Sequence, residues 1–155
     1  ASRFPSRCMS ESEHFRQRSA ELLLQLYEAR REPALREARE WWVTKFHPTS
    51  AKDVLRIWGG TESAPYRMVT TYWEMAASFV TLGAIDVAMF HAANTEYLAI
   101  YAKLRPYLSE VRELAAYPTY LEHLERVVIS LPDAEARLAP IQRYLARRVA
   151  ETSPA

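Results

Sequence analysis

Residues 72–86 decide the fold, and they read Tyr72-Trp73-Glu74-Met75-Ala76-Ala77-Ser78-Phe79-Val80-Thr81-Leu82-Gly83-Ala84-Ile85-Asp86. Apolar residues in and just before this run recur every three or four positions, which lines one face of a helix. They are Met68, Val69, Tyr72, Trp73, Ala76, Phe79 and Val80. Gly83 stands where a left-handed residue ends a helix, and Asp86 can cap the next helix by accepting a backbone N–H. The pattern predicts two helices that meet at a tight corner.

A long Tyr-rich helix is predicted to follow from Thr95. Its apolar residues repeat with the same period, and they are Leu98, Tyr101, Leu104, Leu108 and Val111. Pro106 lies inside this pattern. Because proline has no N–H, it leaves the carbonyl four residues earlier without its helical partner. We therefore expect one helix with a kink near Ala102.

Cap residues and prolines divide the rest of the chain into further helices. Serine at the N-cap and proline in the first turn are typical of helix starts, and such signals stand at Ser10, Pro33, Ser50 and Pro65. Pro118 and Pro132 break the chain before two further helices. Ser10 and Glu13 also have the capping-box spacing. Residues 127–131 have strand character, but a lone strand has nothing to pair with, so we expect a helix there too.

Length and composition indicate one domain. The chain has 155 residues, the usual size of a single domain. It is 49% hydrophobic and 25% charged, close to the globular average, so neither disorder nor a coiled-coil rod is favoured. We predict a single compact all-α domain, an irregular bundle of six to eight helices, over residues 10–151. Residues 1–9 are expected to form a leader or flexible N-terminus, and residues 152–155 to fray.

Charge and hydropathy exclude several classes of protein. The net charge is +1, which gives no electrostatic footprint for nucleic acid. No apolar run approaches the roughly 18 residues that span a bilayer, and no signal-peptide core is present. The single cysteine, Cys8, cannot form an internal disulfide, which fits a reducing compartment. We expect a cytoplasmic protein. Two origins of the N-terminus remain open: a natural start at Met9, or a fragment cut downstream of a membrane anchor.

The run 73–86, residues 97–101, and residues 104–108 with Arg112 together resemble a bacterial family of small all-helical proteins known only as a domain of unknown function. Residues 33–39 resemble the opening of that family's second helix. The chain departs from the family at Tyr101, where a tryptophan is expected. The resemblance implies a helical fold, frequently attached to an N-terminal membrane helix, with no assigned activity. It thus implies a tether outside this chain, at the cytoplasmic face of a membrane.

No motif for metal binding or catalysis stands out. Glu11 and His14 have the Glu-x-x-His spacing of di-iron bundles, but such a site needs the motif twice. An acid in a first helical turn is already explained by the helix dipole. His47, His91 and His123 show no mutual ligand spacing, and no glycine-rich phosphate loop is present. We expect no catalytic residue, no metal and no cofactor.

The candidate ligand or clamp residues are Trp73, Glu74, Tyr101, Arg105 and Arg112. The two arginines are seven positions apart and share a helix face, so they could hold the Glu74 carboxylate in a forked pair. Such a pair is more often a clamp between helices than an anion site. Trp73 and Tyr101 belong to an aromatic set that could line a pocket but at helical spacing is more often core. The other members are Trp41, Trp42, Trp58, Tyr72, Phe79 and Tyr97.

Two functions remain open from the sequence. The first is a non-enzymatic helical module for protein interaction or self-association, as a homodimer or with a protein partner. The second is a small-molecule or anion-binding protein, or an enzyme, with an aromatic pocket and arginine anchors. The first is favoured, because the familiar catalytic motifs are absent whereas helical surfaces bind partners through apolar stripes without a recognisable motif.

Overall fold

The computed structural model describes residues 10–152, and every regular element in that part of the chain is a helix. The all-α prediction is confirmed. The predictions for residues 1–9 and 153–155 lie outside the described residues. The helices are α1 (Glu11–Ala29), α2 (Pro33–Thr44), α3 (Ala51–Trp58), α4 (Ser63–Thr81), α5 (Val87–Ala93), α6 (Glu96–Leu104), α7 (Leu108–Leu114), α8 (Glu122–Ile129) and α9 (Ala134–Thr152).

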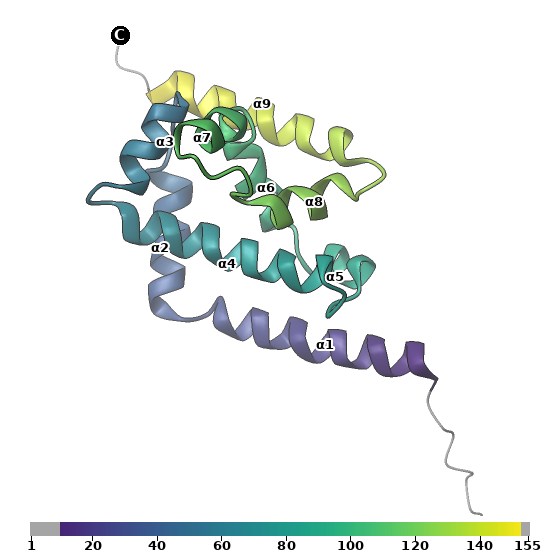
Figure 1. The fold of residues 1–155 in the computed structure, drawn as a ribbon. Helices are drawn as coiled ribbons and strands as arrows, with labels where there is room; N and C mark the ends of the chain where they lie inside the picture. The colour runs from purple at the N-terminus through teal and green to yellow at the C-terminus, as the bar shows by residue number, and fades with distance from the viewer. Residues whose placement is uncertain (1–9, 153–155) are drawn as a thin grey trace, which may run out of the picture.

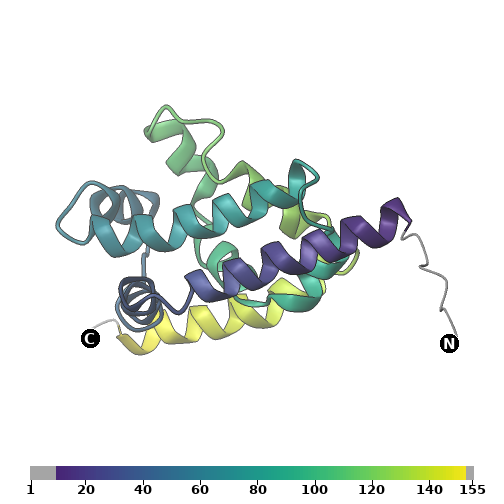
Figure 2. The same ribbon diagram turned by 90° about the horizontal axis from the view of Figure 1, so that it is seen from below.

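The central helix is α4. Figure 1 shows it between α1 on one side and α8 with α9 on the other, and it packs chiefly against α2 and α8. Figure 2 shows the same body from below, and in both views α1 begins at one end of the molecule and α9 ends at the other. Of the predicted apolar face of α4, the central part around Trp73 is buried, and Phe79 and Val80 are half-buried. The prediction was wrong for Met68, which is 38% exposed.

Aromatic rings from α2 and α4 meet where these helices cross. The ring centroids of Trp42 and Phe46 are 4.4 Å apart, and those of Trp42 and Tyr66 are 5.8 Å apart. In the aromatic set singled out from the sequence, five residues are buried and three are half-buried. The buried ones are Trp42, Tyr72, Trp73, Tyr97 and Tyr101. These aromatic side chains therefore pack in or against the hydrophobic core.

The described residues contain nine helices, more than the six to eight predicted, and Pro106 is the reason. The long helix expected from Thr95 is two helices, because α6 ends at Leu104 and α7 begins at Leu108. Pro106 offers no N–H to the carbonyl of Ala102. The Tyr107 N–H donates to the carbonyl of Leu104 at 2.9 Å, which closes a tight turn. The prediction of a kinked continuous helix was wrong.

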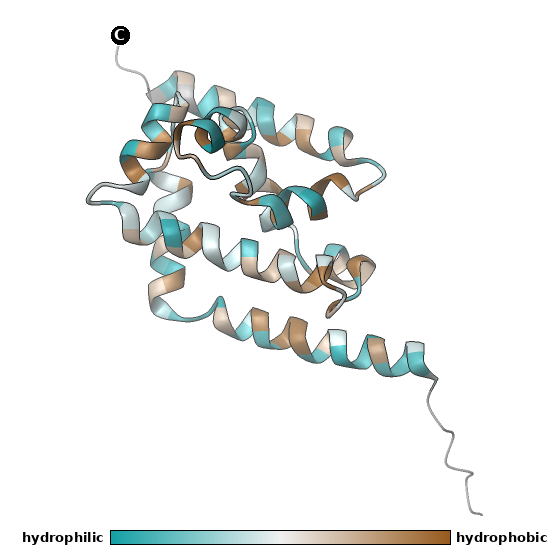
Figure 3. Cartoon of the chain, viewed as in Figure 1, coloured by the Kyte–Doolittle hydropathy of each residue, from teal (hydrophilic) through white to brown (hydrophobic). Residues whose placement is uncertain are grey.

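Helix ends that depend on local sequence are confirmed. The Glu13 N–H donates to Ser10 Oγ at 3.2 Å, and the Ser10 N–H donates to Glu13 Oε2 at 2.7 Å, which completes the capping box. Asp86 accepts from the Met89 N–H at 2.9 Å and caps α5. Teal and brown segments alternate along α1 and α9 in Figure 3, as expected for amphipathic helices. Among the described helices, none combines the length and apolar character needed to cross a bilayer.

Gly83 ends α4 with a positive φ of 81°, as predicted. The N–H of Ala84 donates to the carbonyl of Phe79 at 2.7 Å, and that of Gly83 donates to Val80 at 3.0 Å, which is a Schellman motif. Replacement of Gly83 by alanine should cost about 1 kcal/mol, because a side chain disfavours this backbone conformation. An added Cβ would meet nothing within 4 Å, so no clash contributes.

Urea denaturation of Gly83→Ala measures this cost. Gly59→Ala is the matched control, because Gly59 ends α3 at φ −92°, a conformation that alanine adopts freely. The control should lose less stability than Gly83→Ala. Equal stabilities for the two variants would mean that the left-handed backbone is not what Gly83 contributes.

Candidate functional site

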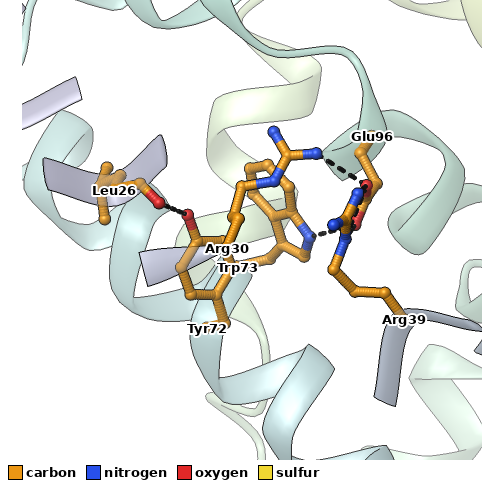
Figure 4. A network of polar contacts seen from close by, with 6 residues as sticks. All are labelled: Leu26, Arg30, Arg39, Tyr72, Trp73 and Glu96. Atoms are coloured by element: carbon orange, nitrogen blue, oxygen red, sulfur yellow. Dashed lines mark hydrogen bonds and ion pairs between the residues drawn. The ribbon is translucent and has the colours of Figure 1, made fainter. Parts of the chain in front are cut away.

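A carboxylate shared by two arginines lies where α1, α2, α4 and α6 meet (Figure 4). Glu96 opens α6 and accepts hydrogen bonds from Arg30 Nη2 at 2.8 Å and from Arg39 Nε at 2.8 Å. Arg39 Nη2 donates to the same carboxylate, so Arg39 binds it with both arms of its fork. The indole N–H of Trp73 also donates to Glu96, at 3.3 Å.

The surroundings of Glu96 keep its charge in place. The guanidinium of Arg30 lies over the Trp73 ring, 5.2 Å from the ring centroid. Burial alone would raise the pKa of Glu96, but the hydrogen bonds from Arg39 and the charges of Arg39 and Arg30 outweigh it and lower that pKa. The Tyr72 hydroxyl donates to the Leu26 carbonyl at 2.6 Å and fixes α1 beside the cluster (Figure 4). The ionised carboxylate on α6 therefore binds side chains at the end of α1, on α2 and on α4.

Glu74 caps another helix instead of pairing with an arginine. Its carboxylate accepts from the backbone N–H of His123 at 3.0 Å and of Leu124 at 2.9 Å, at the start of α8. A carboxylate at a helix N-terminus accepts hydrogen bonds from the free N–H groups, and its negative charge interacts favourably with the positive end of the helix dipole. The predicted forked pair of Glu74 with Arg105 or Arg112 is wrong, since neither arginine forms an ion pair with Glu74 among the described residues.

Arg112 and Tyr101 lie close to the same end of α8, whereas Arg105 does not. Arg112 Nε donates to the Tyr120 carbonyl at 2.9 Å, and the Arg112 guanidinium forms an ion pair with Glu125 at 2.9 Å. The Tyr101 hydroxyl donates to the same Glu125 at 3.2 Å. Arg105 instead pairs with Glu135 on α9. The five candidate residues therefore divide among three places: Trp73 lies beside Glu96, Arg105 follows α6 and pairs with Glu135 on α9, and the other three lie at the start of α8.

Glu74→Gln should destabilise the protein by about 1 kcal/mol, because glutamine keeps one acceptor oxygen but loses the charge at the start of α8. The change is measured by urea denaturation. Glu21→Gln is the control, since Glu21 is exposed in the middle of α1 and its side chain forms no ion pair or hydrogen bond among the described residues, and such surface substitutions change stability by about 0.5 kcal/mol or less. If the two variants lost the same stability, the cap would not be what Glu74 contributes.

Lys103 on α6 caps the C-terminal end of α2. Nζ donates to the carbonyl of Trp42 at 2.7 Å and to that of Phe46 at 2.8 Å. The Phe46 N–H bonds to the carbonyl of Trp41, one residue further back than in a regular helix, so it does not satisfy Trp42. Burial, with a smaller effect of Arg148, lowers the pKa of Lys103 to about 8. A buried lysine on one helix thus donates hydrogen bonds to free carbonyl groups at the C-terminus of another helix.

A groove of about 390 Å³ lies between α4 and the connection from α7 to α8. Thr71, Met75 and Ser78 line it on α4, and Tyr117 and Tyr120 line it across from them. The connection holds two non-glycine residues in the left-handed conformation, Ala116 at φ 51° and Leu121 at φ 55°. The contacts of Glu74 and Arg112 hold this strained segment in shape.

Sequence reasoning missed the Glu96 cluster and the Lys103 cap. Arg30, Arg39 and Glu96 are too far apart in sequence for any spacing to connect them. One available signal was Trp73, because a buried indole N–H requires an acceptor. In residues 10–152 there is no group of three or more His, Cys, Asp or Glu side chains that could hold a metal ion.

A comparison with protein families matches residues 17–130 to a domain of unknown function (DUF4760). The matched segment contains Glu96, Glu74 and Lys103 together with the residues they contact in α1, α2, α4 and α8. No curated protein and no solved structure matched the chain.

Proposed function

The chain belongs to the family of the domain of unknown function DUF4760, and we propose that it is a non-enzymatic helical module that self-associates through the exposed face of α4. The charged side chains inside the molecule support a structural role for its interior. Glu74, Glu96 and Lys103 all hold helices together. A partner would therefore bind at the surface of the protein.

The observation that carries the proposal is a row of five residues on α4, here called the α4 stripe: Met68, Thr71, Met75, Ser78 and Leu82. They are separated alternately by three and four positions, which is the a/d spacing of a coiled-coil seam. Met75 is 42% exposed, and Leu82, the residue that follows the helix, is 76% exposed. The buried face of α4 is formed by other residues, so this spacing does not serve the core.

The α4 stripe is complementary to itself. Along it, large apolar side chains alternate with small polar ones. In an antiparallel pair of α4 helices, Met75 can face Ser78 of the second copy while Leu82 faces Thr71 of that copy. Each large side chain then fills the space beside a small one, and methionine adapts readily to such a surface. A two-fold interface of this kind uses the same patch on both subunits.

The groove beside the α4 stripe extends the surface available to a second copy. A stable interface buries about 1,200–2,000 Å² in total, more than one pair of helices supplies. Met75 and Ser78 belong to the stripe and also line the groove, whose far side carries the half-exposed ring of Tyr117. The stripe and the groove thus form one continuous surface on which apolar side chains alternate with polar ones.

Sedimentation equilibrium over a range of concentrations tests the proposal. The wild-type chain should sediment as a dimer and Met75→Glu as a monomer, because the charge would be buried without a partner. Val87→Glu is the matched control: Val87 is also 42% exposed but lies on α5, so this variant should remain dimeric. A monomeric wild type, or a Met75→Glu variant that dimerises as well as Val87→Glu, would contradict the proposal.

A further inference from the structure

A pocket of about 270 Å³ at the corner between α1 and α2 is lined by four arginines and one tyrosine. The residues are Tyr27, Arg30, Arg31, Arg36 and Arg39. Two carboxylates pair with these arginines: Glu96 with Arg30 and Arg39, and Glu28 with Arg31. Four positive charges therefore meet two negative ones, and the pocket has a surplus of positive charge.

Arg36 carries much of that surplus. It is exposed, and its guanidinium forms no ion pair or hydrogen bond in residues 10–152. The neighbouring acids Glu32 and Glu37 do not line the pocket. Glu40 lines an adjoining depression with Arg36 and Arg39 but forms no ion pair with either of them.

Two further arginines of the pocket, Arg30 and Arg39, are half-buried and are already held in place without a ligand. Arg30 is fixed between the Trp73 ring and Glu96, and Arg39 is fixed by its forked contact with Glu96. Figure 4 shows both guanidinium groups converging on that carboxylate from α1 and α2. A binding site whose side chains are ordered before the ligand arrives loses less conformational entropy on binding. Glu96 would then act as a positioning residue for this pocket.

We propose that this pocket binds a phosphate group. A guanidinium donates through a planar fork that matches the oxygens of phosphate, and a cluster of arginines is a recurring way to bind phosphorylated ligands. The dianion balances the surplus charge of the pocket, and the Tyr27 hydroxyl adds a neutral donor. The volume fits a small anion or a headgroup at the surface, because pockets for larger organic ligands usually exceed about 300 Å³.

Isothermal titration with inorganic phosphate tests the proposal on the whole chain. The wild type should bind phosphate, and Arg36→Gln should bind it about tenfold more weakly, since a charged hydrogen bond is lost. Within residues 10–152 the Arg36 side chain has no partner whose loss would unfold the protein. Arg56→Gln on α3 is the control: this arginine is 70% exposed and lies outside the pocket, so the variant should bind like the wild type.

A second arm distinguishes a free phosphate compound from a lipid headgroup. Flotation with vesicles of phosphatidylcholine and phosphatidic acid in equal parts is compared with vesicles of phosphatidylcholine alone. Recovery with the acidic vesicles that Arg36→Gln reduces and Arg56→Gln does not would assign the lipid as the source. Absence of both phosphate and vesicle binding would overturn the proposal, and so would equal losses in the two variants, which would indicate non-specific attraction by positive charge.

Discussion

Glu96→Gln should be the most destabilising of the substitutions considered, with a loss of about 3 kcal/mol in the free energy of unfolding. The change leaves the guanidinium groups of Arg30 and Arg39 without their shared negative charge in a site where these side chains are only 17% and 29% exposed. It also weakens the acceptor of the Trp73 indole N–H. Four helices meet at this carboxylate, so the loss should appear in global urea or thermal unfolding rather than as local fraying.

Glu28→Gln is the control for this prediction. Glu28 also pairs with an arginine, but both side chains of the Glu28–Arg31 pair are 66% exposed. Exposed pairs contribute about 0.2–1 kcal/mol. Similar losses for Glu96→Gln and Glu28→Gln would show that the buried position of Glu96 does not matter.

The same cluster predicts a dependence on pH. The pKa of Glu96 is lower in the folded protein than in the unfolded chain, so the unfolded state takes up its proton first as the pH falls. The stabilising effect of Glu96 is therefore complete above the unfolded pKa and is lost as the pH falls through the folded pKa. The difference in stability between the wild type and Glu96→Gln should shrink below about pH 4.5. A constant difference would contradict this account.

Lys103→Met should cost about 2 kcal/mol, because methionine fills the space of the side chain but leaves the buried carbonyls of Trp42 and Phe46 without donors. Part of the cost of burying the charge is recovered, which keeps the loss below that of Glu96→Gln. Urea denaturation measures the effect. Lys45→Met, at an exposed lysine just after α2, should change stability by about 0.5 kcal/mol or less.

The pH dependence of Lys103 runs in the opposite sense to that of Glu96. Its folded pKa of about 8 lies below its ordinary value of 10.5, so between these values the unfolded state binds more protons. The wild type should therefore gain stability relative to Lys103→Met as the pH rises from about 8 to about 10. A difference in stability that stays constant over this interval would show that the lysine is not desolvated in the folded protein.

Local signals in the sequence predicted the helix ends that depend on neighbouring residues. Gly83 ends α4 in the left-handed conformation, and Ser10 and Asp86 cap the helices that follow them. In each case the atoms that interact are within five residues of one another, so the pattern of side chains determines the contact. Pro106 was recognised as a perturbation, but whether a proline kinks a helix or ends it depends on what packs around it.

The charged contacts between helices could not be predicted in the same way. Glu74 accepts from backbone atoms 49 and 50 residues away, and Lys103 donates to carbonyls 61 and 57 residues away. A backbone N–H or carbonyl has no residue type, so the sequence holds no complementary partner to search for. Glu74 was predicted to pair with an arginine, and that partner was wrong for this reason.

The α4 stripe was also overlooked from the sequence, because its spacing overlaps with that of the buried face. Met68 was assigned to the apolar face of the helix, yet in the structure it is exposed together with Met75 and Leu82. When one helix has two apolar faces, the buried face can be told from the exposed one only when the neighbouring helices are known.

Disulfide cross-linking between two single-cysteine variants tests self-association through α4 most directly. In a Cys8→Ser background, Met75→Cys and Ser78→Cys chains are mixed and oxidised, with Ala88→Cys on α5 as the control. An antiparallel pair of α4 stripes brings residue 75 of one copy against residue 78 of the other, within the reach of a disulfide. The account predicts that this mixture forms linked dimers faster than either variant alone and faster than any mixture with Ala88→Cys. Linkage at equal rates in all mixtures would contradict it.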